Sequence, residues 1–153
     1  MSPLLRAVSF STFALALAAC GDNQDPAGAD AFWDKIHDED YASKWASPPG
    51  YAMRTPSSAA HGDEVIIYIN DTVQATLAGG AGLSTWPEGS LIVKEGYDGE
   101  SIHAIAAMEK RSGAWYWAEW SGDGVAKYSG SPDICTSCHE SGSDYVRAFS
   151  LPK

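Results

Sequence analysis

Positively charged residues are scarce in this sequence. Ten Lys and Arg stand against twenty Asp and Glu, which gives a formal net charge of −10 at pH 7. A protein that binds nucleic acid needs clustered Lys and Arg to neutralise phosphates, and no basic run occurs here. The composition therefore excludes nucleic acid as a partner and predicts a soluble, acidic domain.

Long hydrophobic runs are lacking as well. The apolar stretch at residues 7–19 follows Arg6 and is too short for a helix that must cross roughly 30 Å of hydrocarbon. It ends Leu17-Ala18-Ala19-Cys20, which resembles the lipobox of bacterial lipoproteins. The resemblance implies that the signal peptide 1–19 is removed, that Cys20 is acylated, and that the protein lies on the periplasmic side of the cell envelope. An ordinary secretory signal with an incidental cysteine is the alternative.

Cysteine is also rare, and its count limits the disulfides that an exported chain can form. The sequence has three cysteines. If Cys20 carries lipid, only Cys135 and Cys138 remain. Residues 20–28 are polar, contain Pro and Gly, and predict a flexible tether, so the membrane is contacted through the lipid anchor alone. Residues 29–153 are then expected to form one domain.

The remaining sequence predicts an α+β fold. Residues 29–45 carry apolar side chains at roughly helical spacing, and residues 47–62 hold three prolines and two glycines, which is typical of a long loop. β-Branched and aromatic runs with short Gly/Asp turns then indicate an antiparallel meander. We expect strands at residues 64–69, 90–94, 102–108, 115–120 and 125–128, a short helix at 72–78, and a short C-terminal helix that binds haem.

The C-terminal motif Cys135-Thr-Ser-Cys138-His139 is the strongest chemical signal. A thioredoxin-type C-x-x-C stands early in a βαβ pattern, whereas this one follows the predicted sheet, and a structural zinc site needs a second ligand pair. A c-type haem needs two thiols for its vinyl groups and an adjacent histidine for its iron. On a helical turn started by Pro132, these side chains lie at i, i+3 and i+4 and face one side. The motif favours one covalent haem c; a redox disulfide and zinc are the alternatives.

No methionine follows His139 in the sequence. Most small electron-transfer cytochromes c carry the haem motif near the N-terminus and use a later Met as second axial ligand. Here Met53 and Met108 both precede the motif. The sixth iron position is therefore expected to be empty or weakly filled, so that small ligands can bind.

Three separate blocks resemble the cytochrome P-460 family, whose superfamily includes the cytochromes c′-beta. They are residues 86–95 (WPEGSLIVKE), 115–120 (WYWAEW) and 135–139 (CTSCH), and the similarity covers roughly residues 62–151. The resemblance implies a small, mainly β, homodimeric periplasmic haem protein with five-coordinate iron. Some members oxidise hydroxylamine, and the c′-beta members bind nitric oxide.

The resemblance also assigns roles to single residues. Lys94 matches the lysine that is cross-linked to a haem meso carbon in hydroxylamine-oxidising members; a strand-end lysine with a solvated head is the alternative. Those members use an arginine on the first strand and a glutamate on the strand after the lysine for proton transfer. Residues 64–68 hold no arginine, and Ile105 falls near the expected carboxylate. His103, expected on the same face as Ile105, is the candidate proton acceptor, with a structural histidine as the alternative.

Together these patterns predict a lipid-anchored haem c protein that binds nitric oxide or a related small nitrogen ligand. One alternative is a hydroxylamine oxidoreductase with Lys94-linked haem that passes electrons to a soluble cytochrome. The other is a structural envelope lipoprotein whose C-x-x-C forms a disulfide. Trp115 and Trp117 are expected to share one strand face, with Tyr116 and Trp120 on the other, as core or dimer contacts.

Overall fold

The computed structural model describes residues 22–79 and 81–153, so the predicted signal peptide and Cys20 lie outside the described residues. Its helices are α1 (Pro26–Asp38), α2 (Tyr41–Lys44), α3 (Asp71–Gly79) and α4 (Asp133–His139). Its strands are β1 (Thr55–Pro56), β2 (Glu64–Ile69), β3 (Leu91–Asp98), β4 (Ser101–Arg111), β5 (Ala114–Ser121) and β6 (Ala126–Gly130). In this part of the chain, no helix is long and apolar enough to cross a membrane.

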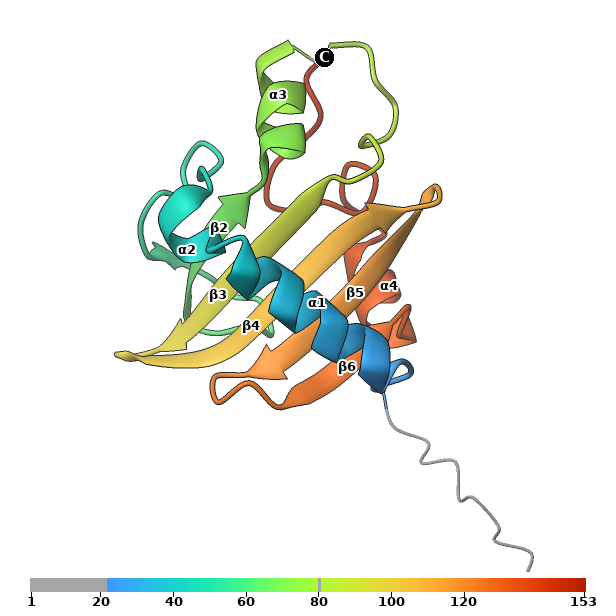
Figure 1. Ribbon diagram of the computed structural model, residues 1–153. Helices are drawn as coiled ribbons and strands as arrows, with labels where there is room; N and C mark the ends of the chain where they lie inside the picture. Colours follow the sequence, from blue (N-terminus) through green and yellow to red (C-terminus); the bar gives the residue numbers. More distant parts are fainter. Residues whose placement is uncertain (1–21, 80) are drawn as a thin grey trace, which may run out of the picture.

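The strands form one sheet in the order β1-β2-β3-β4-β5-β6, and every neighbouring pair is antiparallel (Figure 1). The predicted antiparallel meander and α+β class are confirmed. The short strand β1 was not predicted, because Pro56 and the surrounding Gly, Pro and Ser residues are typical of a loop. The central strands β3 and β4 run longer than the predicted segments at residues 90–94 and 102–108.

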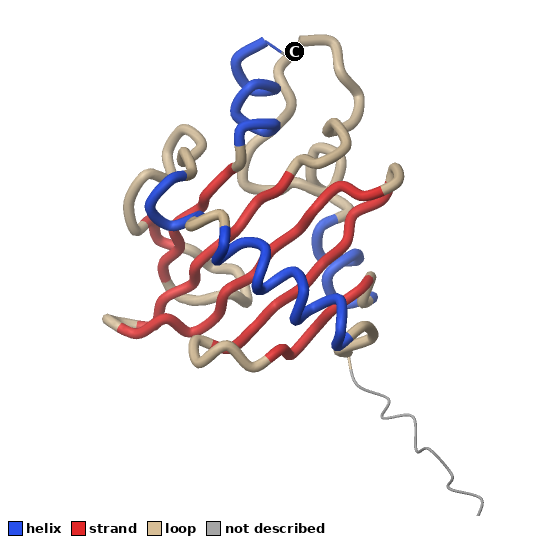
Figure 2. The backbone as a smooth tube through the Cα atoms, viewed as in Figure 1, coloured by secondary structure: helices blue, strands red, loops and turns tan. Residues whose placement is uncertain are grey.

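Helices lie on both faces of this sheet (Figures 1 and 2). Helix α1 crosses one face, called the α1 face below, and its Phe32 and Ile36 are buried there. The other face, called the α4 face, is covered by α4 and the C-terminal segment 140–153, from which Val146 and Leu151 enter the core. Strand alternation explains this division, because successive side chains point to opposite sides of a sheet.

The α1 face has an aromatic and aliphatic core. Trp120 is 1% exposed, and its ring centroid lies 6.0 Å from that of Phe32 in an edge-to-face arrangement. Tyr116 also contacts Phe32 from this side, at 5.8 Å. Trp115 and Trp117 belong to the core of the α4 face. The prediction that the two pairs occupy opposite faces is therefore confirmed.

The N-terminal boundary differs from the predicted tether at residues 20–28. Helix α1 begins at Pro26, and the Asp25 carboxylate caps it by accepting a hydrogen bond from the Gly28 N–H at 3.1 Å. Residues 22–24 run beside β6, where the Gln24 N–H donates to the Ser129 carbonyl at 3.2 Å. Asp followed by Pro is a start signal for a helix, and it outweighs the polar composition that suggested a tether.

Candidate functional site

Helix α4 presents the C-x-x-C-H motif beside the sheet. Pro132 precedes the helix in an extended conformation, and its carbonyl accepts hydrogen bonds from the N–H groups of Cys135 and Thr136 at 3.0 and 3.1 Å. Cys135 is half-buried against the core of the α4 face, whereas Cys138 is exposed, and both carry free thiols. The i, i+3 and i+4 spacing puts both thiols and the following histidine on adjoining parts of one helix surface.

The His139 side chain is held in one orientation. Its Nδ1 lies 2.9 Å from the backbone carbonyl oxygen of Tyr145, which can only accept a hydrogen bond, so Nδ1 carries the proton. Nε2 therefore keeps its lone pair, and no hydrogen bond from the described residues engages it. The ring packs edge-on against Trp117, with centroids 4.6 Å apart.

The protonation state of His139 follows from its surroundings. Burial lowers the pKa of His139 to about 4, against the opposing effect of the hydrogen bond to the Tyr145 carbonyl. The neighbouring Lys94, His61 and Arg147 also contribute electrostatically to this lowering of the pKa. At neutral pH the imidazole is uncharged, which is the form that binds a metal.

Lys94 and Glu119 lie in one row across the sheet, on the α4 face. In β3, β4 and β5 the paired residues are Lys94, Ala106 and Glu119, and side chains of directly paired residues point to the same side. The small side chain of Ala106 stands between the two charged residues. A lysine and a carboxylate therefore share the face that α4 covers.

Glu119 is paired with a histidine from the loop before β2. The His61 Nδ1 lies 2.7 Å from the Glu119 carboxylate, and the two side chains are 18% and 20% exposed. The His61 ring centroid is also 6.3 Å from that of His139. A Cβ on Gly96 would lie only 1.6 Å from the His61 carbonyl oxygen. Glycine at position 96 thus permits the loop to cross β3 and bring His61 to this site.

The electrostatics of Lys94 connect it to α4. Burial lowers the pKa of the Lys94 ammonium, and the neighbouring Arg147 guanidinium lowers it further, whereas Cys138 and Glu119 act in the opposite direction. Arg147 itself donates to the Cys138 sulfur at 3.0 Å. A lowered pKa increases the neutral fraction of an amine, and the neutral amine is the nucleophilic form.

The structure corrects the placement of Ile105. Lys94 pairs with Ala106, while Ile105 pairs with Glu95 and Trp120 and is buried in the core of the α1 face. Ile105 therefore does not stand where a carboxylate would serve Lys94, and the carboxylate on that face is Glu119. The error arose because residue spacing along β4 does not reveal which of its side chains lie on the same face of the sheet as Lys94 of β3.

His103 is not brought to Lys94 or His139. Its Nδ1 lies 2.9 Å from the Asp98 carboxylate at the end of the β3–β4 hairpin, and the two side chains are 50% and 52% exposed. The register shifts between Gly96 and Tyr97, so His103 itself has no directly paired residue in β3. Its predicted role as proton acceptor gains no support from this position.

Sequence reasoning missed three residues of this site, His61, Glu119 and Arg147. Glu119 had a usable signal, because it follows Trp117 by two residues and must share its strand face. His61 and Arg147 had none, since each reaches the site through the path of a loop or the C-terminal segment.

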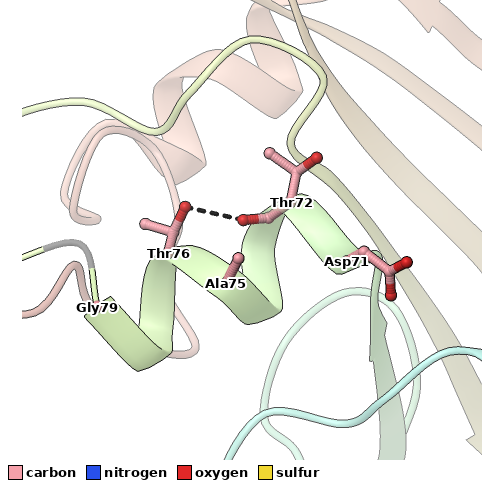
Figure 3. A pocket seen from close by; sticks show the side chains of 5 residues that line it. All are labelled: Asp71, Thr72, Ala75, Thr76 and Gly79. Carbon is pink, nitrogen blue, oxygen red and sulfur yellow. Dashed lines mark hydrogen bonds between the residues drawn. The ribbon is translucent and has the colours of Figure 1, made fainter.

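A surface hollow of about 600 Å³ lies elsewhere, along α3 (Figure 3). Its lining consists of Asp71, Thr72, Ala75, Thr76 and Gly79. The Thr76 hydroxyl donates to the Thr72 carbonyl at 2.8 Å within the helix. This lining contains one ionisable side chain, whereas several ionisable side chains lie close together beside α4. The residues beside α4 are therefore the better candidate for a functional site.

The chain was compared with protein families, curated proteins and solved structures. No family model matches it, and no curated protein or solved structure is significantly similar to it. Within residues 22–79 and 81–153, no three His, Cys, Asp or Glu side chains are grouped to hold a metal ion. An iron that is already held in a porphyrin needs fewer protein ligands, and His139 offers one.

Proposed function

We propose that this protein is a c-type haem protein of the cell envelope that binds nitric oxide or a related small nitrogen ligand. The observation that carries the proposal is the arrangement on α4. Cys135 and Cys138 supply free thiols, and His139 offers Nε2 while Nδ1 donates to a carbonyl. These residues fit a covalent haem c, which when bound would supply an iron with a position for a small ligand.

The methionines support an open ligand position. Met53 is 74% exposed in the loop between α2 and β1, and Met108 is 6% exposed in the core beside Trp117. No methionine lies in the segment after His139. Residues 140–153 therefore do not supply a later Met of the kind that closes the iron in most small electron-transfer cytochromes.

Covalent attachment is the first test. The protein is expressed in a host that matures c-type cytochromes, and the denatured chain is examined by intact mass and by absorption. We expect one haem on the wild type and none on the Cys135→Ala/Cys138→Ala double variant. The matched control is Cys20→Ser, which leaves the haem motif intact and should retain haem. A denatured wild-type chain without haem would refute the proposal.

Hydroxylamine oxidation is a second candidate, favoured by Lys94 and Glu119 on one face. Protons must leave hydroxylamine as electrons do, and Glu119, hydrogen-bonded to His61, can accept them. The resemblance to cytochrome P-460 implies that Lys94 is cross-linked to haem and that a soluble cytochrome accepts the electrons. A positioned base contributes about 10²–10⁴-fold to such a step, so Glu119→Gln should slow turnover by a factor of this order.

The two candidates are separated by spectra, peptide mapping and turnover. A haem-containing tryptic peptide that includes Lys94, a band that shifts in Lys94→Ala, and steady hydroxylamine oxidation with an added cytochrome would favour the oxidoreductase. Binding of nitric oxide without turnover, and identical spectra for wild type and Lys94→Ala, would favour the ligand-binding protein.

Attachment to the membrane through Cys20 is part of the same proposal. The Asp22 backbone carbonyl accepts a hydrogen bond from the Ser129 N–H of β6 at 3.2 Å, and Asp22 lies two positions after Cys20 in the sequence. Because consecutive Cα atoms are about 3.8 Å apart, an acylated Cys20 would hold this sheet edge close to the lipid surface. Cys20→Ser should leave the signal peptide uncleaved at this site, or should release the protein from the membrane fraction if another peptidase cleaves it; a soluble, unmodified wild type would refute the attachment.

A further inference from the structure

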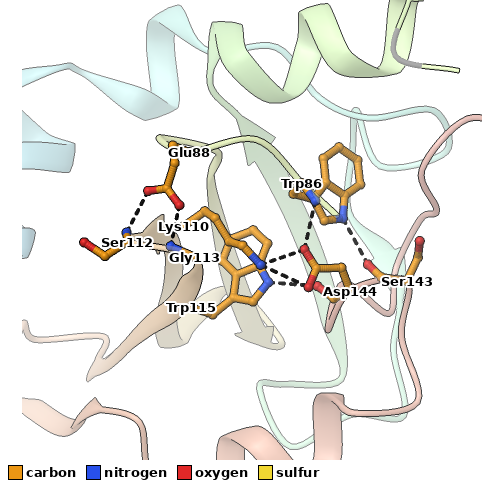
Figure 4. A network of polar contacts seen from close by, with 8 residues as sticks. All are labelled: Trp86, Glu88, Lys110, Ser112, Gly113, Trp115, Ser143 and Asp144. Atoms are coloured by element: carbon orange, nitrogen blue, oxygen red, sulfur yellow. Dashed lines mark hydrogen bonds and ion pairs between the residues drawn. The ribbon is translucent and has the colours of Figure 1, made fainter. Parts of the chain in front are cut away.

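A buried ion pair fixes the segment that follows α4. The Lys110 ammonium on β4 lies 2.8 and 3.0 Å from the two carboxylate oxygens of Asp144, and the side chains are 6% and 10% exposed (Figure 4). A buried pair of this kind is sensitive to loss of one partner, because the other charge is left uncompensated. Asp144 is therefore a fixed point in an otherwise irregular segment.

Two tryptophans hold the same segment. The Trp86 backbone N–H donates to the Asp144 carboxylate at 2.8 Å, and its indole N–H donates to the Ser143 carbonyl at 3.0 Å. The Trp115 indole N–H donates to the Asp144 carbonyl at 2.8 Å. Figure 4 shows Lys110 and both indoles converging on Ser143 and Asp144 from different parts of the fold. We call these five residues the clamp.

The clamp holds an unusual backbone conformation. Asp144 and Tyr145 have φ angles of 45° and 67°, in the left-handed region that residues other than glycine rarely adopt. Such a conformation persists when surrounding contacts determine it. Its consequence is that the Tyr145 carbonyl points back to α4 and accepts the hydrogen bond from His139 Nδ1 at 2.9 Å.

We propose that Lys110 and Asp144 are positioning residues for His139, which would bind the haem iron, and that they act through the Tyr145 carbonyl; this rests on the proposed haem function. The carbonyl fixes the His139 tautomer and ring orientation. It also makes Nε2 more basic, because a hydrogen bond from the other ring nitrogen increases the electron density of the imidazole. When haem is bound, a more basic His139 imidazole would strengthen its bond to the iron and would favour the ferric state.

If the clamp has only a structural role, its variants should behave differently from those of a clamp that positions His139. Either role lowers stability when the ion pair is removed, so stability alone does not separate them. Only the positioning role changes the tautomer of His139, the iron–histidine stretching frequency and the reduction potential. These three properties are therefore the measurements of choice.

The test uses Lys110→Met and Asp144→Asn in the haem-loaded, full-length protein. We expect a lower iron–histidine stretching frequency in resonance Raman spectra of the ferrous protein and a more positive reduction potential than in the wild type. Lys110→Arg keeps the charge pair and should return both values toward those of the wild type. Trp115→Phe removes one hydrogen bond to Asp144 and should give a smaller shift of the same sign, which keeps the test available if the charge variants fold poorly.

Glu88→Gln is the matched control. Glu88 accepts hydrogen bonds from the backbone N–H groups of Ser112 and Gly113 in the β4–β5 turn near the clamp (Figure 4). Among the described residues it forms no hydrogen bond or ion pair with Asp144 or Tyr145. Its variant should lose stability without a change in frequency or potential. Folded, haem-loaded clamp variants with wild-type frequency and potential would overturn the proposal.

The His139 tautomer gives a readout on the chain itself. Nitrogen-15 NMR of the wild type without haem should show a single form with the proton on Nδ1, and Lys110→Met should show a mixture of tautomers. An unchanged single tautomer in Lys110→Met overturns the positioning role even if haem attachment succeeds. A wild type that carries no covalent haem refutes the proposed function instead, and the tautomer measurement still decides the role of the clamp.

Discussion

Lys94 and Glu95 are neighbours in β3, yet they project to opposite faces of the sheet and meet different surroundings. Glu95 is 6% exposed on the α1 face, and its carboxylate accepts hydrogen bonds from three tyrosine hydroxyls. The distances are 2.8 Å from Tyr41, 3.0 Å from Tyr68 and 2.6 Å from Tyr97. The protein thus satisfies this buried charge with its own donors.

The polar groups of the α4 face have different surroundings from Glu95. Lys94 lies among groups of both signs, His139 keeps Nε2 free of hydrogen bonds from the described residues, and the Cys135 and Cys138 thiols are unreacted. These polar groups are not used up by contacts within the protein, and they lie beside a core of tryptophans. Such an arrangement is more typical of a ligand-binding site than of a purely structural one. We therefore propose that the chemistry takes place on the α4 face, whereas the polar groups of the α1 face stabilise the fold.

The largest expected effect comes from the aromatic core of the α1 face. Trp120→Ala removes a side chain that is 1% exposed and should lower the free energy of unfolding by about 3–5 kcal/mol. Trp117→Ala, on the α4 face, should also destabilise the protein, since Trp117 is 5% exposed. Only Trp117→Ala should change the haem spectrum, because this ring contacts His139. Denaturant unfolding and absorption spectra of both variants test the division, and a spectral change in Trp120→Ala would contradict it.

A smaller effect is expected where the loop crosses β3. Gly96→Ala places a Cβ against the His61 carbonyl and should cost about 1–3 kcal/mol, because backbone must move to make room. The shift should also separate His61 from Glu119, so the pair on the α4 face is lost together with stability. Gly79→Ala is the control, since a Cβ there would meet nothing within 4 Å. Equal stability for the two variants would show that the close approach at Gly96 is relieved without cost.

The tyrosines around Glu95 predict a loss of stability at alkaline pH. Burial and the hydrogen bond to Glu95 raise the pKa of Tyr97 from 10.0 to about 12. Between these values the unfolded chain loses the Tyr97 proton while the folded chain keeps it. Stability from this group is therefore complete below pH 10 and declines as the pH rises toward 12. Tyr97→Phe should weaken the decline, as measured by denaturant unfolding at pH 8, 10 and 11; an unchanged slope would refute the assignment.

Much of the fold was predictable from local patterns, whereas the site was predictable only in part. Antiparallel pairing followed from β-branched runs with short turns, and the helical turn of the C-x-x-C-H motif followed from Pro132. The face of Ile105 was not predictable, because it depends on how β4 is registered against Lys94. His61 and Arg147 required the three-dimensional path of the chain, which no local pattern records.

The smallest expected effect is that of His103→Ala, which we compare with His61→Ala because either histidine is a candidate for proton transfer. His103 forms an exposed ion pair with Asp98. Because exposed pairs contribute about 0–1 kcal/mol, His103→Ala should lower the free energy of unfolding by no more than about 1 kcal/mol. His61→Ala removes the partner of Glu119 in a largely buried pair and should have the larger effect on the α4 face. Nitric oxide affinity and hydroxylamine turnover are measured for both haem-loaded variants. Wild-type values in His103→Ala with altered values in His61→Ala would place proton transfer beside Lys94. Altered values in His103→Ala with wild-type values in His61→Ala would instead assign proton transfer to the β3–β4 hairpin. That result would contradict the assignment of the chemistry to the α4 face.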